Sequence, residues 1–142
     1  MKLSIDKVVF IDTSAFLSLY FADDEFHTRA LKALEILKEE KNRLVTSNFI
    51  LDELYTWIRK RKGKSYAVDF AQFLAENDDI LSKVKILSID EQKAWEYFQK
   101  LPGRDVSFTD CTSFALMDRL KITSAFTFDS DFKTAGFSVL PK

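Results

Sequence analysis

The chain has 142 residues, of which 46% are hydrophobic, and a formal net charge of −1. This length is that of a single domain, here taken as residues 1–142, and the apolar fraction is enough for a full core. The near-zero charge argues against a protein that binds nucleic acid through bulk positive charge, but an enzyme can still hold phosphates locally.

Cysteine content and hydropathy indicate the compartment in which the protein functions. Cys111 is the only cysteine, which excludes an internal disulfide and fits a reducing compartment. No apolar run approaches the ~20 residues that a membrane-spanning helix needs. The N-terminal sequence MKLSIDKVVF carries acid and base and has no apolar h-region, so we expect no signal peptide. Together these features predict a cytoplasmic domain without membrane contact.

Strand-like and helix-like segments alternate along the chain. The predicted order is a strand at 7–11, helices at 13–20 and 24–40, a strand at 43–47, helices at 48–61 and 65–76, a strand at 83–89, helices at 89–100 and 108–120, and strands at 124–128 and 137–140. Ser88 with Glu91 has the spacing of a capping box, Ser107 opens the next helix, and Gly63 is placed as a C-cap. This alternation predicts a single-domain three-layer α/β/α fold with a central parallel sheet.

Two acidic residues directly follow the two most apolar strands. Asp12 follows VVFI, and Asp129 follows AFTF. We expect these strands to be central, and the carboxyl ends of parallel strands share the edge of the sheet where ligands bind. The sequence therefore predicts that Asp12 and Asp129 lie at one functional edge.

Two helices add one acid each. At about 100° per residue, Glu53 falls at the edge of the apolar face of helix 48–61, whereas Asp52 points away from it. On helix 108–120, Asp110 falls in the apolar arc, and Asp118 lies ~12 Å further along the axis. Glu53 and Asp110 are therefore the helical acids that can approach the sheet edge.

A simpler explanation exists for each acid taken alone. Asp12 and Asp129 could be N-caps, Asp110 could close a capping box with Ser107, and Glu53 could be a solvated charge. These explanations do not account for four acids at one sheet edge, where like charges repel. A divalent cation relieves that repulsion, and an all-oxygen site suits Mg²⁺ or Mn²⁺. With one His and one Cys far apart in the sequence, zinc is disfavoured.

Four segments carry a resemblance to a known family. FIDTSAF, TSNFILDEL, SFTDCTSFALM and FTFDSDF resemble, in order and spacing, the acidic motifs of the PIN-domain ribonucleases, especially the VapC-type toxins of toxin–antitoxin pairs. The resemblance covers nearly the whole chain. It implies that the catalytic, metal-binding acids are Asp12, Glu53, Asp110 and Asp129. Asp131 could supplement or replace Asp129, which comes first after the apolar run.

The same resemblance implies supporting residues, an activity and partners. The hydroxyls that fall where the family has supporting polar groups are those of Thr13, Ser14, Thr109 and Thr127. The implied activity is Mg²⁺-dependent cleavage of RNA phosphodiester bonds, and the implied partners are a cognate antitoxin and a second copy of the chain. A haloacid-dehalogenase-like phosphatase is disfavoured, because Ser14 stands where that family has a second Asp. A catalytically weak PIN module that binds RNA or acts as a scaffold is the remaining alternative.

One basic run, RKRKGK, ends helix 48–61. Its charges could simply be solvated at the helix C-terminus, where they complement the dipole. Alternatively they clamp RNA phosphates beside the acidic edge. The candidate RNA-binding residues are Arg59, Lys60, Arg61, Lys62 and Lys64.

Overall fold

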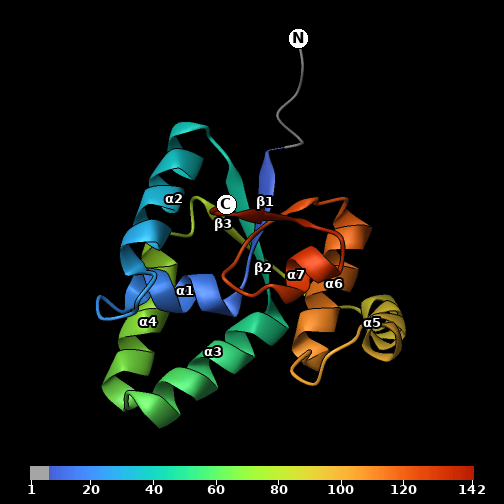
Figure 1. Ribbon diagram of the computed structural model, residues 1–142. Coiled ribbons are helices and arrows are strands. Elements are labelled where there is room, and N and C mark those ends of the chain that lie inside the picture. The colour runs from blue at the N-terminus through green and yellow to red at the C-terminus, as the bar shows by residue number, and fades with distance from the viewer. Residues whose placement is uncertain (1–6) are drawn as a thin grey trace.

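The computed structural model describes residues 7–142 and contains one five-stranded sheet (Figure 1). Its strands are β1 (Val8–Ile11), β2 (Arg43–Ser47), β3 (Leu81–Val84), β4 (Ser124–Phe126) and β5 (Ser138–Leu140). Their order is β3-β2-β1-β4-β5, and each neighbouring pair is parallel. The prediction of a parallel sheet is confirmed, with β1 at its centre and β4 beside it.

Within residues 7–142, seven helices flank this sheet. They are α1 (Thr13–Tyr20), α2 (His27–Glu39), α3 (Asn48–Arg61), α4 (Lys64–Glu76), α5 (Ser88–Lys100), α6 (Phe108–Leu120) and α7 (Asp131–Thr134). Figure 1 shows α1, α2 and α4 on one side and α5, α6 and α7 on the other, with α3 below the end of β2. The three-layer α/β/α prediction is therefore confirmed.

Alternate side chains of β1 bury themselves in the two helical layers, as the pleat of a strand requires. Ile11 lines a small pocket with Phe16 and Leu34 of the first layer. Phe10 instead packs against Phe132 of α7, with ring centroids 6.2 Å apart. Because β1 is buried on both faces, the residue that follows it, Asp12, is fixed by a rigid element.

The prediction for the start of the second helix is wrong by three residues. The helix expected from residue 24 begins at His27. Asp24 Oδ1 accepts hydrogen bonds from Phe26 N at 2.8 Å and Ser18 Oγ at 2.9 Å. Such a carboxylate-to-backbone bond stabilises a turn in competition with helix, so the acidic segment stays in the α1–α2 connection.

The strand expected at 83–89 is displaced, and so is the cap that follows it. The strand is β3, and it ends at Val84, after which Ile86 N donates to Asn48 Oδ1 at 2.7 Å. Leu87 is the N-cap of α5, and its N–H donates to Asp90 Oδ2 at 2.8 Å. The Ser88–Glu91 capping box is therefore wrong by one residue.

Other boundaries agree closely with the sequence. Ser107 caps α6 as predicted. The C-cap of α3 is Lys62, and the predicted C-cap, Gly63, is the next residue, with a φ of 109°. The strand expected at 124–128 ends at Phe126, and the short helix α7 was not predicted. Residues 7–142 contain no helix long and apolar enough to cross a membrane. The segment from which we expected no signal peptide falls mostly on residues 1–6, outside the described residues.

Candidate active site

Asp12 lies at the end of β1 with only 3% of its surface exposed. Its Oδ2 accepts hydrogen bonds from Thr127 Oγ1 at 2.9 Å and from Ser14 Oγ at 3.2 Å. Ser14 Oγ also lies 3.1 Å from Thr127 Oγ1 and accepts from Phe128 N at 2.9 Å. These bonds join the ends of β1 and β4. The Asp12 carboxylate makes no capping bond to α1, so helix capping does not explain its position.

Glu53 reaches the same edge from the second turn of α3. Its Oε1 accepts a 2.6 Å hydrogen bond from Thr13 Oγ1, and its side chain is half-buried. Ser47 caps α3 through a bond from Ile50 N, which sets where the helix begins at the end of β2. The adjacent Asp52 is exposed, as its position on the helix predicts.

Asp110 has two structural tasks at the start of α6. Its Oδ2 accepts from Ser107 N at 3.1 Å, and its own N–H donates to Ser107 Oγ at 3.0 Å, which completes the capping box. The residue is only 8% exposed, and a carboxylate has further lone pairs beyond those of the cap. Asp110 can therefore cap α6 and ligate a cation at the same time.

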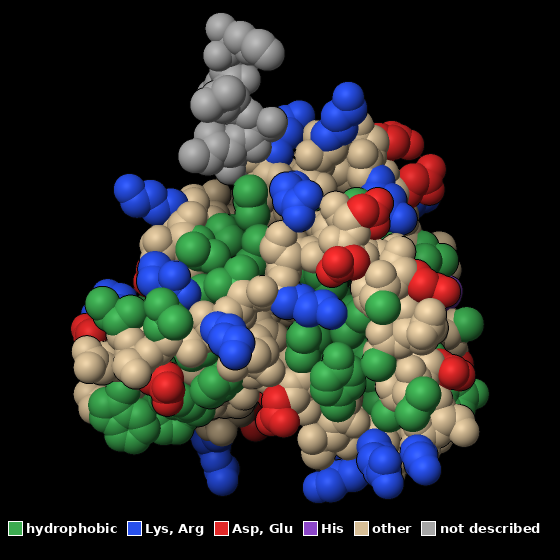
Figure 2. Space-filling model, turned by 180° about the vertical axis from the view of Figure 1, so that it is seen from behind, with side chains coloured by type: hydrophobic (Ala, Val, Ile, Leu, Met, Phe, Trp, Pro, Cys, Tyr) green, Lys and Arg blue, Asp and Glu red, His purple; other side chains and the backbone are tan. Residues whose placement is uncertain are grey.

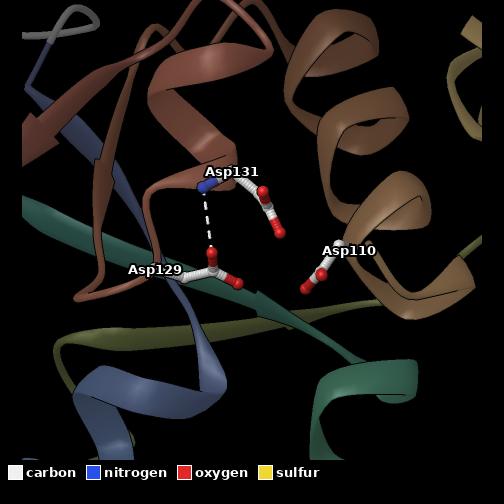
Figure 3. Close-up of side chains that lie close together, drawn as sticks. All are labelled: Asp110, Asp129 and Asp131. Atoms are coloured by element: carbon white, nitrogen blue, oxygen red, sulfur yellow. Dashed lines mark hydrogen bonds between the residues drawn. The ribbon is translucent and has the colours of Figure 1, made fainter. Parts of the chain in front are cut away.

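Three carboxylates converge at this edge. Ligand oxygens of Asp110, Asp129 and Asp131 lie within 4.8 Å of one another. Figure 3 shows Asp131 reaching in from the start of α7 and Asp110 from α6, with Asp129 below Asp131 and facing Asp110. Asp131 N donates to Asp129 Oδ1 at 2.9 Å, so the two acids on this loop are positioned together. Asp129 and Asp131 both belong to the cluster by geometry.

Burial, and to a smaller extent the charges of neighbouring acids, raise the pKa values of Asp12, Asp110 and Asp131. Burial raises the pKa of Asp12 to about 6, with smaller increases from the charges of Asp129 and Glu53 and an opposing effect of the Thr127 hydrogen bond. Burial, followed by the charges of Asp12 and Asp129, raises the pKa of Asp110 to about 7. Burial and Asp129 also raise the pKa of Asp131. Ionised carboxylates at such short range need a compensating positive charge.

The chemistry of the donor set fits a hard divalent cation. The converging groups are carboxylate oxygens, the ligands that Mg²⁺ and Mn²⁺ prefer. Cys111 is the one nearby thiol, and it is buried. Burial and the neighbouring charge of Asp110 raise the pKa of Cys111 to about 11, so it stays protonated and is a poor ligand.

A groove of about 390 Å³ begins at Glu53 and runs along α3. Glu53 and Thr109 line it at the acidic end, and Lys60 and Arg61 line it further along the helix. Trp57 lies between these ends and is a groove residue that the sequence did not single out as part of the site. Its spacing of four residues from Glu53 is the signal that could have identified it, because residues i and i+4 share a helix face.

Sequence and structure comparisons agree on the family. The model of the PIN domain matches residues 9–138. The 23S rRNA-specific endonuclease VapC20 of Mycobacterium tuberculosis is 34% identical over 131 residues, which are 92% of this chain and 95% of that protein. The crystal structure of M. tuberculosis VapC20, described as a sarcin-ricin loop cleaving toxin, superposes with a TM-score of 0.77 at 33% identity and covers 91% of this chain and 95% of its own.

Two more distant structures share the fold. VapBC2 from Rickettsia felis bound to a promoter DNA fragment superposes with a TM-score of 0.68 at 17% identity, covering 93% of this chain and 96% of that chain. FitAcB from Neisseria gonorrhoeae gives 0.66 at 14% identity, covering 92% and 95%. The chain belongs to the PIN domain family, and it is a homologue of the VapC toxins. The predicted family and its endonuclease class are confirmed.

Proposed function

We propose that this protein is a Mg²⁺-dependent endoribonuclease and the toxin of a toxin–antitoxin pair. The observation that carries the proposal is the convergence of Asp110, Asp129 and Asp131 at the edge where β1 ends in the buried Asp12. The VapC20 toxin, to which the chain is similar over nearly its full length, is named an rRNA endonuclease. We propose structured cellular RNA, and rRNA in particular, as the substrate.

Some of the acids would bind the cation, and others would orient the reacting water. Asp12 and Asp110 would hold Mg²⁺ or Mn²⁺, with Glu53, Asp129 and Asp131 completing its surroundings. When bound, the cation supplies Lewis acidity toward a phosphoryl oxygen and lowers the pKa of a bound water. Glu53 Oε1 is occupied by Thr13, so its second oxygen is the one free to accept a proton from the attacking water.

Hydroxyl groups keep the acids in place. Ser14 and Thr127 both bond to Asp12 Oδ2, and Thr127 Oγ1 also accepts from Asp129 N at 3.0 Å. One threonine therefore fixes an acid from each of two neighbouring strands. Thr109 lines the groove together with Glu53. Such supporting bonds set ligand orientation and basicity at metal sites.

We propose two protein partners, a cognate antitoxin and a second copy of the chain, in the cytoplasm where RNA is available. Around Tyr20–Phe26 the aromatic rings pack inward: Tyr20 contacts Phe21 and Phe70, and Phe21 is only 8% exposed. Exposed apolar side chains lie on α5, where Trp95 is 53% and Phe98 42% exposed and their rings stack. Light scattering tests self-association: a dimer mass supports it, and a monomer at every concentration contradicts it.

The nuclease proposal is tested on purified protein with defined RNAs. We expect cleavage with Mg²⁺, none with EDTA, and none with Asp110→Asn, which keeps a side-chain oxygen for Ser107 N. Asp78→Asn is the matched control, because Asp78 is an exposed acid that precedes β3, at the amino end of that strand and away from the cluster. RNA binding without cleavage under all conditions contradicts the proposal and supports the RNA-binding module.

A further inference from the structure

The groove beside the acidic cluster is built from one face of α3. Glu53, Trp57, Lys60 and Arg61 are spaced at i, i+4, i+7 and i+8, which places them along one stripe of a helix. Thr109, from the first turn of α6, forms part of the opposite wall. The groove therefore shares Glu53 with the candidate active site, and its volume of about 390 Å³ is in the range of small-molecule sites.

The two ends of the groove carry opposite charge. Asp52 and Glu53 lie at the acidic end, and Lys60 and Arg61 lie at the other. Seven residues separate Glu53 from Lys60, which is ~10 Å along a helix. A cation at the acidic end and two basic side chains at the far end can contact different phosphates of one strand. Figure 2, which views the molecule from behind, shows Lys and Arg side chains gathered along the lower edge, below the junction of α3 and α4.

Trp57 and Arg61 form a stack in the middle of this path. The guanidinium carbon of Arg61 lies 5.1 Å from the centroid of the Trp57 ring, which is cation–π geometry. Arg61 is exposed, and Trp57 is half-buried. Nucleobases stack on both aromatic rings and guanidinium planes, and the contact needs a base that is not paired within a duplex.

The residues of the basic run RKRKGK do not all face the groove. Lys62 does not line the groove: its Nζ lies 3.8 Å from Asp23 Oδ2 and 4.7 Å from the centroid of the Phe21 ring. Lys60 and Arg61 do line it. Lys60 and Arg61 thus face the groove, whereas Lys62 does not. Substitutions at these positions can therefore distinguish a local binding site from general electrostatic attraction of RNA.

We propose that Trp57, Lys60 and Arg61 form a subsite for one unpaired nucleotide next to the scissile phosphate, with the base stacked on the Arg61–Trp57 pair and a phosphate held by Lys60 and Arg61. The inference rests on the proposed ribonuclease function and specifies its substrate: single-stranded or looped RNA, not continuous duplex. The subsite adds affinity for RNA beside the metal site and selects unpaired nucleotides over paired ones.

The test measures binding without cleavage. The chain has two tryptophans, Trp57 and Trp95, so a Trp95→Phe background leaves Trp57 as the only indole reporter. A fluorescent 2′-O-methyl RNA hexamer with Ca²⁺ in place of Mg²⁺ is the probe, followed by Trp57 quenching and by probe anisotropy. We expect the hexamer to quench Trp57 and its blunt duplex form to leave the indole emission unchanged.

Substitutions then separate stacking from charge. Arg61→Ala should weaken hexamer binding by about five- to 100-fold, the range for loss of one base stack. Arg61→Lys keeps the charge but loses the planar group, so binding should fall while its salt dependence stays similar. Lys62→Ala removes one charge outside the groove and should change affinity by less than about twofold. Melting temperatures check that each variant is folded.

Three results would contradict the proposed subsite. They are no quenching of Trp57 emission by the hexamer, equal losses of hexamer affinity for Arg61→Ala and Lys62→Ala, or equal affinity for the hexamer and its duplex. Each would indicate bulk electrostatic binding, or a groove that serves a partner protein. The outcome is independent of the nuclease assay. Quenching that depends on Arg61 without cleavage in Mg²⁺ contradicts the proposed nuclease only, and cleavage with no contribution from Arg61 contradicts the subsite only.

Discussion

Thr13 Oγ1 donates a 2.6 Å hydrogen bond to Glu53 Oε1 across 40 residues of sequence. Thr13 directly follows the buried Asp12, so the bond ties the orientation of an acid on α3 to the end of the central strand. Charge-assisted bonds of this length are strong and hold their partners in one geometry. We infer that Thr13 sets the orientation of the Glu53 carboxylate.

Removal of this hydroxyl should impair catalysis more than folding. Thr13→Val keeps the shape of the side chain but releases Glu53, and loss of a comparable supporting bond costs about 10–100-fold in metal affinity or activity. Thr13→Ser retains the hydroxyl and should retain most activity. Mn²⁺ titration and RNA cleavage rates measure the effect. Unchanged rates and Mn²⁺ affinity in Thr13→Val would show that the bond does not position Glu53.

Neutralising one crowded acid should stabilise the metal-free protein. Because the folded pKa of Asp110 is raised to about 7, its ionisation opposes folding at pH values above its unfolded pKa of about 4. Asp110→Asn should therefore melt at or above the wild-type temperature in EDTA at about pH 8, and lose this advantage below about pH 4. The exposed Asp52→Asn should show no such trend. A lower melting temperature for Asp110→Asn at about pH 8 would favour capping as the main role of Asp110.

Asp129 and Asp131 should both contribute to cation binding. Asp129→Asn keeps an oxygen that can accept from Asp131 N, so it removes charge without releasing the loop. We expect either single Asn variant to weaken Mn²⁺ binding, measured by electron paramagnetic resonance, and the double variant to abolish it. If Asp131→Asn binds Mn²⁺ as the wild type does, Asp129 alone is the fourth ligand.

A second carboxylate tests stability apart from the site. Asp90 is 2% exposed and accepts bonds from Arg119 at 2.7 and 2.9 Å. Burial alone would raise the pKa of Asp90, but the bonds from Arg119 and Leu87 N and the Arg119 charge outweigh it and lower that pKa. The resulting stability is present above the unfolded pKa of about 4 and is lost as the pH falls through the folded value.

Asp90→Asn should accordingly lower the free energy of unfolding by about 1.5–3 kcal/mol at neutral pH, the range for bonds to charged groups. The difference from wild type should shrink below about pH 4. Denaturant unfolding at several pH values measures it, and cleavage per folded molecule should be unchanged. An equal difference at all pH values would mean that the ion pair is not its source.

The parallel sheet and the proximity of Asp110 and Asp129 could be predicted from the sequence, whereas the cluster of ligand oxygens contains Asp131 and not Asp12 or Glu53. Asp12 and Asp129 follow strongly apolar strands, and helical spacing was enough to separate Glu53 from Asp52. One boundary that failed depends on a side chain far away in sequence: Asn48 accepts a bond from Ile86 N, just after the end of β3. The others depend on local bonds of a kind that hydrophobic pattern does not specify. Asp90, not Glu91, forms the cap of α5.

The sequence left open whether Asp131 supplements or replaces Asp129, and it did not predict the groove. Asp131 enters the cluster from the short helix α7, and four residues give too weak a periodic signal to predict. The Arg61–Trp57 stack depends on the exposed end of α3, where hydrophobic pattern does not specify side-chain positions. Sequence pattern thus predicts which elements meet, while loop and surface contacts complete the site.

The central claim, that these acids form one cation site, is tested most directly by a crystal structure grown with Mn²⁺ and its anomalous difference density. We predict a Mn²⁺ peak between Asp110 and Asp129, within bonding distance of Asp12 or Asp131, that disappears in Asp110→Asn. Well-ordered crystals of the wild-type protein with saturating Mn²⁺ and no peak among these carboxylates would contradict the account.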